Sequence, residues 1–368
     1  MENRQKYFSP LELLRCEIRS FCDCAVITDD INRRYFTGMR SSAGTLAVFF
    51  EKAYLIIDFR YIEKARKTVK DCEVILQKDL YKQINELLKK HSAEKVSVEA
   101  DTLTVSRLAE ISDRLDCEID SSRALSECIG EIRACKRTEE IEKIIAAQRI
   151  AEKGFEHILN YIKPGRTERE IALELDYFML RNGAEALSFD TIALSGKNTS
   201  LPHGVPSDKA VENGDFVLMD YGAVVDGRHS DMTRTVCVGQ PSEEMIKVYD
   251  TVLKAQLAGL SAVRAGISGA ELDKTARDII SNAGYGEYFG HSLGHGVGME
   301  IHEAPTASPT CGNILEPDMI VTIEPGIYLP DKFGVRIEDF VIIKENGCEN
   351  MTRASKELII LEENFCDH

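Results

Sequence analysis

Two acidic residues flank an expected hairpin in the second half of the chain. Asp220 ends the apolar segment 216–219, where a buried carboxylate is costly unless it is paired or bound to a metal. Asp226–Gly227 is a strong signal for a two-residue hairpin loop. With that loop, Asp220 and Asp231 become diagonal neighbours on one side of the hairpin. The pair indicates either a cation site or a solvated pair of charges at the edge of a sheet.

A second acidic pair repeats this arrangement further along the chain. Glu324 follows the apolar segment 320–323, and residues 330–334 are predicted to form the turn. Glu338 then lies on the return strand, near the register position opposite Glu324. Because side chains alternate along a strand, Arg336 shares the face of Glu338. Four anions buried together need cations, so the two hairpins predict a site for divalent metal.

Histidines gather in the same part of the sequence. Five of the eight lie between residues 203 and 302, namely His203, His229, His291, His295 and His302. The glycines around the third and fourth of these argue against a helix and favour close approach of the backbone to a ligand. The zinc signature HExxH is absent. We expect His291, His295 and His302 to belong to the site, and His229 to be structural or on the surface.

The donor types suggest which metal and which reaction to expect. A set rich in oxygen with one imidazole suits Mn²⁺ or a similar ion better than structural zinc, which favours Cys and His. Carboxylates able to bridge favour two ions, about 3.5–4 Å apart in such sites. Two metal ions in such a site lower the pKa of a shared water molecule and polarise a carbonyl group. The expected reaction class is metal-assisted hydrolysis.

The segments that position these residues occur twice. A helical pattern from Ile141 to Ile162 stops at Pro164–Gly165, and Thr167 opens a second helix with a capping box. The same layout recurs at one constant offset, pairing Gly165 with Gly266, Thr167 with Ser268, Glu170 with Glu271, Ile171 with Leu272 and Gly183 with Gly284. We therefore expect an α+β domain with an internal pseudo-two-fold duplication and a site where its halves meet. The first third alternates strand and helix patterns, which predicts a separate α/β domain closing near residue 125.

The composition excludes several classes of protein. The 368 residues include 45 Lys and Arg against 61 Asp and Glu, a formal charge of −16, which argues against a nucleic-acid-binding protein because phosphates need a basic surface. No apolar run approaches the roughly 18 residues of a membrane-spanning helix, and no apolar signal segment is visible. The 11 cysteines form no CxxC pair. We expect a cytoplasmic protein with reduced thiols and with no nucleic-acid or membrane partner.

The residues singled out above lie in motifs that resemble those of the pita-bread metallopeptidases, most of all the proline-specific branch, Xaa-Pro aminopeptidase and prolidase. The motifs are Met219–Gly222, Asp231–Thr235, His291–Gly298, His302–Pro305, Ile323–Tyr328 and Val335–Asp339. Tyr35–Gly38 resembles part of the creatinase/prolidase N-terminal domain. The implied fold is an α/β creatinase-like N-terminal domain, residues 1–125, and an α+β pita-bread catalytic domain, residues 126–368.

The resemblance also implies roles for the site residues. The metal ligands would be Asp220, Asp231, His295, Glu324 and Glu338, holding two divalent ions, Mn²⁺ foremost, with Co²⁺ or Zn²⁺ as alternatives. The catalytic set would be His203, His291, His302, Glu324 and Arg336. In it, Glu324 moves the proton, His302 supports the tetrahedral intermediate, His203 and His291 line the proline pocket, and Arg336 holds carboxylates in place.

The implied substrate is a peptide with proline at its second position. The principal expectation is an Xaa-Pro aminopeptidase, which removes the residue before proline from longer peptides; the alternative is an Xaa-Pro dipeptidase (prolidase). A remote alternative is a non-catalytic binding protein on the same fold, although such proteins usually lose metal ligands and this chain keeps all five types. The resemblance further implies a homodimer.

Overall fold

The structure, a computed structural model, describes residues 8–362 and divides into two compact units after Arg133. The boundary expected at residue 125 falls inside helix α6 (Ala124–Ala134). This helix belongs to the first unit because the Tyr35 hydroxyl donates to the Ile132 carbonyl over 3.3 Å. None of the helices in the described part of the chain combines the length and apolarity that a bilayer-spanning segment needs.

The first unit is built on a six-stranded mixed sheet with the strand order β4-β3-β2-β1-β5-β6. Its strands are β1 (Cys24–Ile27), β2 (Thr45–Phe49), β3 (Ala53–Ile57), β4 (Glu73–Leu76), β5 (Lys95–Val98) and β6 (Glu118–Asp120). Its other helices are α1 (Pro10–Glu17), α2 (Asp30–Thr37), α3 (Ile62–Thr68), α4 (Leu80–His91) and α5 (Val105–Arg114). Apolar side chains of α4 and α5 form one buried cluster with the sheet, which gives this unit its own core.

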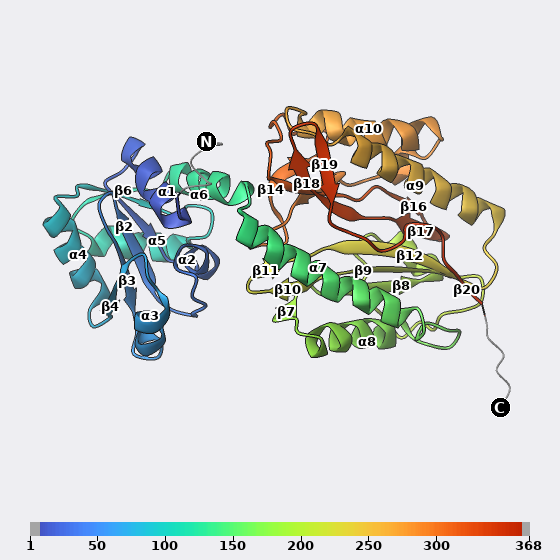
Figure 1. Ribbon diagram of the computed structural model, residues 1–368, viewed down its shortest axis with the longest axis horizontal. Helices are drawn as coiled ribbons and strands as arrows, with labels where there is room; N and C mark the ends of the chain where they lie inside the picture. Colours follow the sequence, from blue (N-terminus) through green and yellow to red (C-terminus); the bar gives the residue numbers. More distant parts are fainter. Residues whose placement is uncertain (1–7, 363–368) are drawn as a thin grey trace. The chain divides into compact units, whose positions relative to one another are not determined.

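Two pairs of helices frame the second unit. They are α7 (Thr138–Ile158) with α8 (Glu168–Arg181), and α9 (Glu243–Ala262) with α10 (Gly269–Asn282). Figure 1 shows the first pair (green) below and in front of the strands and the second pair (yellow to orange) above them. Each pair packs on its own apolar cluster. This arrangement confirms the two similar halves expected from the sequence.

The repeated helix starts have the same local geometry. Thr167 and Ser268 each cap the helix that follows, and each forms a complete capping box with the glutamate three residues on. The glycines two residues before these caps have positive φ angles of 87° at Gly165 and 83° at Gly266, a conformation that glycine adopts readily. The α7 helix ends at Ile158, whereas the apolar pattern predicted it to Ile162. The pattern continues beyond the helix because the turn that follows also buries apolar side chains.

The strands of the first half form a four-stranded sheet, β20-β12-β9-β8, and a three-stranded sheet, β11-β10-β7. Their bounds are β7 (Ala186–Leu187), β8 (Ile192–Ser195), β9 (Phe216–Tyr221), β10 (Ala223–Val225), β11 (Arg228–His229), β12 (Met232–Val238) and β20 (Ile360–Leu361). Val225 pairs with Arg228 and Tyr221 with Met232. These pairs confirm the two-residue loop at 226–227 and the register that it sets.

The second half repeats the hairpin with a longer loop. Its strands are β13 (Gly294–Gly296), β14 (Glu303–Ala307), β15 (Ile320–Ile323), β16 (Gly326–Leu329), β17 (Phe333–Arg336), β18 (Asp339–Lys344) and β19 (Gly347–Asn350). Ile323 pairs with Asp339 and Leu329 with Phe333, so Glu324 lies opposite Glu338 as expected. The turn is shorter than the expected 330–334, because Phe333 and Gly334 belong to β17 and already pair with β16.

Candidate metal centre

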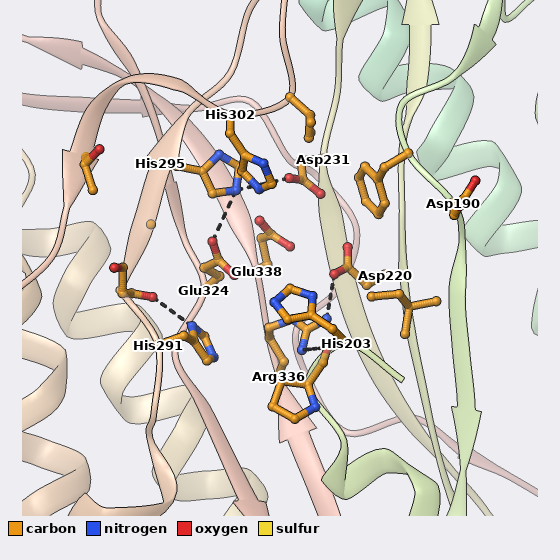
Figure 2. A pocket seen from close by; sticks show the side chains of 17 residues that line it. Asp190, His203, Asp220, Asp231, His291, His295, His302, Glu324, Arg336 and Glu338 are labelled. Carbon is orange, nitrogen blue, oxygen red and sulfur yellow. Dashed lines mark hydrogen bonds and ion pairs between the residues drawn. The ribbon is translucent and has the colours of Figure 1, made fainter. Parts of the chain in front are cut away.

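A cavity of about 480 Å³ is lined by all nine side chains that the sequence singled out for the site. They are His203, Asp220, Asp231, His291, His295, His302, Glu324, Arg336 and Glu338. Figure 2 shows the four carboxylates pointing from the two halves toward a shared space, with the histidines around them. His229 is not among the residues that line the cavity; its ring hydrogen-bonds to the Ser188 hydroxyl at 2.9 Å.

The ligand-type residues stand in strands or in the short breaks between strands. Asp220 lies near the end of β9, and Asp231 lies between β11 and β12. Glu324 separates β15 from β16, and Glu338 separates β17 from β18. His295 lies in β13, in keeping with the prediction that its glycine-rich surroundings are not helical. Two hairpins and one further strand thus bring five side chains together from positions far apart in the sequence.

The centre of the cluster is the group Asp231, His295 and Glu338. One ligand atom from each lies within 4.8 Å of the others. Glu324 adjoins the group, since its Oε1 is 3.3 Å from the Nε2 atom of His295. Asp220 lies beside it and is bound through Oδ2 to Arg336 at 2.5 Å. The group of three could hold an ion, and Glu324 and Asp220 extend its donor set.

Three carboxylate oxygens of the cluster are buried without a hydrogen-bond partner. They are Asp220 Oδ1, Asp231 Oδ1 and Glu338 Oε1. Each such buried acceptor costs free energy unless something satisfies it. Hard divalent cations prefer oxygen donors of this kind. The residues present therefore fit divalent metal ions.

Burial also perturbs the titration of the cluster. It raises the pKa of Asp231 well above its usual range, and the charges of Glu338 and Asp220 raise it further. Burial, followed by the charge of Glu324, does the same for Glu338. Burial raises the pKa of Glu324 to about 8, although Arg336 opposes the shift. Without cations these carboxyl groups therefore retain protons near neutral pH, and metal ions would have to displace them.

Arg336 connects several members of the cluster. Besides Asp220, its guanidinium donates to the Tyr328 hydroxyl at 2.7 Å and to Thr233 Oγ1 at 3.0 Å. Thr233 in turn donates to Glu338 Oε2 at 2.7 Å. One buried cation thus orients two acidic side chains, one directly and one through a hydroxyl.

Three hydroxyls that orient site residues were not identified from the sequence, those of Thr233, Thr322 and Tyr328. Thr322 Oγ1 accepts from the His295 amide at 3.0 Å and donates to Glu324 at 3.1 Å. The available signal was the alternation of side chains along a strand, which places Thr322 on the face of Glu324 and Thr233 on the face of Asp231. The hydroxyl of Tyr328, four residues after Glu324, contacts both Arg336 and His291.

His291 and His302 line the cavity as neutral rings. His291 is held between the Ser292 carbonyl at 2.8 Å and the Tyr328 hydroxyl at 2.9 Å. Burial, and then the charge of Arg336, lowers the pKa of His291 to about 4. The rings of His302 and His295 lie edge to face with centroids 4.3 Å apart. Burial lowers the pKa of both rings, so each can offer a neutral nitrogen.

An apolar part of the lining was not predicted. Phe189, Ile192 and Ile301 contribute to the cavity wall. None of the three belongs to the motifs of acidic residues and histidines from which the site was predicted. Apolar residues of this kind are common throughout the chain, so only the folded arrangement separates them from the core.

Comparison with known families agrees with this geometry. The model of metallopeptidase family M24 matches residues 142–345, and the model of the creatinase/prolidase N-terminal domain matches residues 18–135. The chain belongs to metallopeptidase family M24. Its fold is accordingly a creatinase-type N-terminal domain followed by a pita-bread catalytic domain, as the sequence predicted. It is a prolidase-like enzyme of family M24, and membership implies divalent metal ions.

Individual relatives are similar over nearly the whole chain. A solved structure described as an Xaa-Pro dipeptidase from Bacillus anthracis has a TM-score of 0.92 and 42% identity, covering 96% of this chain and 99% of that one. An Xaa-Pro dipeptidase from Pyrococcus furiosus is 40% identical over 92% of this chain and 95% of its own length. The structure of an X-Pro aminopeptidase from Thermotoga maritima has a TM-score of 0.86 and 36% identity, covering 92% and 97%.

Proposed function

We propose that the chain is an Xaa-Pro dipeptidase, which hydrolyses the bond between an N-terminal residue and proline. Relatives described as Xaa-Pro dipeptidases support this activity more than the aminopeptidase that was the principal expectation from the sequence. The observation that carries the metal-dependent hydrolysis is the trio of unpartnered carboxylate oxygens near His295. It marks a buried site that needs cations, at the wall of a cavity large enough for a small peptide.

Five side chains would hold two divalent ions, Mn²⁺ foremost. They are Asp220, Asp231, His295, Glu324 and Glu338. Asp231 and Glu338 lie within the central group and each has an oxygen without a partner, so both would contribute directly to holding the ions. When bound, the ions would lower the pKa of a water molecule and polarise the substrate carbonyl.

The chain's own groups would then position the substrate and move the proton. Glu324 lies at the cavity wall with its Oε1 3.3 Å from His295 Nε2, so its carboxylate is placed to take a proton from the attacking water and give it to the proline nitrogen. His302 is suited to donate a hydrogen bond to the oxygen of the tetrahedral intermediate. His203 and His291, which also line the cavity, would orient the substrate.

One feature of the cavity favours longer substrates and keeps the aminopeptidase as a second candidate. A dipeptide presents the proline carboxylate, which a guanidinium or ammonium group would bind best. Among the described lining residues, Arg336 is the one Lys or Arg side chain, and Asp220, Tyr328 and Thr233 already engage it. In a longer peptide the same position is an uncharged amide, which needs no such partner.

Parallel assays separate these activities. Release of the N-terminal residue is measured on an Xaa-Pro dipeptide and on an Xaa-Pro-Yaa-Zaa tetrapeptide, with added Mn²⁺ and with a chelator. Chelator-sensitive cleavage of the dipeptide alone supports the dipeptidase, whereas cleavage of both supports the aminopeptidase. No turnover of either by protein shown to contain metal contradicts the proposal. That result would favour another substrate or a non-catalytic binding role.

A further inference from the structure

His203 reaches the cavity from the tip of a loop between Ser195 and Ser207. Pro202 and His203 line the cavity, whereas Val205 beside them is 83% exposed. The tip meets the cavity wall through a long contact, 3.4 Å from Arg336 to the Pro202 carbonyl, and the nearest short bond is made earlier in the loop, where Thr199 Oγ1 accepts from the Gly334 amide at 2.7 Å. The position of His203 must therefore depend on how the two ends of its loop are held.

A buried carboxylate joins the two ends of this loop. Glu168, the first residue of α8, is fully buried. Its Oε1 accepts from the Ser195 amide at 2.7 Å and from the Asn198 side chain at 3.0 Å. Its Oε2 accepts from the amide and the hydroxyl of Ser207 at 3.0 and 2.6 Å. Oε1 thus holds the start of the loop, and Oε2 holds its end while also accepting from the Asn198 side chain at 3.2 Å.

Glu168 has no direct role at the reacting atoms. It is not among the residues that line the cavity, and no ion pair to it is found among the described residues. Neutral donors alone satisfy its charge, an arrangement that is strong when every lone pair is used. Two backbone bonds also hold the end of the loop to α8, from Glu168 to the Lys209 carbonyl and from Arg169 to the Ser207 carbonyl. These bonds survive a side-chain substitution, so the loop stays attached when the carboxylate is altered.

We propose that Glu168 is a positioning residue that fixes His203 in the cavity by closing the loop from Ser195 to Ser207; the kinetic consequence rests on the proposed function. Glutamine has nearly the same shape but only one acceptor oxygen. In Glu168→Gln, its amide group would face N–H and O–H donors at one end of the loop. The contacts of the carboxylate with that end of the loop are weakened, while the backbone bonds to α8 remain.

The test uses one spectroscopic and one kinetic readout. The imidazole Cε1–H resonance of His203, assigned by its loss in His203→Ala, is recorded in the Zn²⁺-loaded protein. We expect Glu168→Gln to shift or broaden this resonance and to leave those of His291 and His302 in place. Glu170→Gln is the matched control, because Glu170 caps the same helix from its exposed side without contacting the loop. It should leave all three resonances unchanged.

The kinetic readout is a double-mutant cycle. We expect Glu168→Gln to lower kcat/KM for an Xaa-Pro substrate by about 10- to 100-fold, the cost of a misplaced positioning group. In a His203→Ala background the same substitution should cost no more than about twofold, since the group that it positions is gone. Equal losses in both backgrounds would overturn the proposal. So would an unchanged His203 resonance, or equal shifts of His291 and His302.

A milder variant covers the case in which Glu168→Gln does not fold. Ser207→Ala removes one donor and keeps the buried carboxylate, and it should perturb the His203 resonance in the same selective way. An unchanged resonance in that variant would likewise overturn the proposal. If the wild-type protein does not cleave Xaa-Pro substrates, the proposed function fails, while the spectroscopic readout still decides whether Glu168 positions His203.

Discussion

Metal binding should displace protons from the acidic cluster. At pH 6.5 a carboxyl with the pKa of Glu324, about 8, is almost fully protonated, and burial raises the pKa values of Asp231 and Glu338 as well. Because the groups interact, their protons belong to the cluster as a whole. We expect Mn²⁺ to release about two to three of them. His295 adds none, since burial lowers its pKa and leaves the ring neutral.

The proton count sets the pH dependence of metal affinity. With two to three protons displaced, lowering the pH from 7.5 to 6.5 should weaken binding by about 10²- to 10³-fold, or roughly 3–4 kcal/mol. Titration calorimetry in buffers of different ionisation enthalpy measures the number directly. Asp231→Asn should release about one proton fewer at saturating metal, whereas Glu170→Gln should match the wild type. Release of less than one proton, with affinity independent of pH, would refute the account of the cluster's burial and mutual repulsion.

Three further results are expected. Burial raises the pKa of Glu324 from an unfolded value near 4.3 to about 8, so the contribution of this carboxyl to the stability of the metal-free protein should be fully present below about pH 4.3 and be lost at about 1.4 kcal/mol per pH unit up to about pH 8; calorimetric melting with chelator should show this loss and excess Mn²⁺ should remove it. His302→Ala should lower kcat by about 10²- to 10³-fold if the ring supports the oxyanion, and an unchanged kcat in steady-state assays would exclude it from that role. Arg336→Lys cannot reach Asp220, Tyr328 and Thr233 together, so calorimetry should find metal affinity reduced by about 10- to 100-fold, and wild-type affinity would contradict its role as a holder of carboxylates.

The sequence was most informative where local chemistry determines geometry. The Asp226–Gly227 loop sets a register that brings Asp220 and Asp231 to one side, and the structure has that register. Capping boxes at Thr167 and Ser268 likewise predicted helix starts and the duplication. These signals lie within a few residues of each other, so no knowledge of distant contacts is needed to interpret them.

The features that were missed depend on contacts between distant segments. The apolar pattern of α7 continues to Ile162 because the turn after the helix also packs on the core, so periodicity alone could not place its end. In the sequence Glu168 looks like an ordinary acidic residue in the first turn of a helix. Only the folded loop shows that its carboxylate is buried. The expected homodimer and cytoplasmic location stay predictions.

The central claim is that Glu324 and its metal-binding neighbours hydrolyse the bond before proline. The most direct test is a comparison of proline release from an Xaa-Pro dipeptide by wild-type protein and Glu324→Gln, each shown to be folded and to hold metal. The account predicts turnover by the wild type and none by the variant, because glutamine can neither take nor give the proton. Near-equal rates in the two proteins would contradict it.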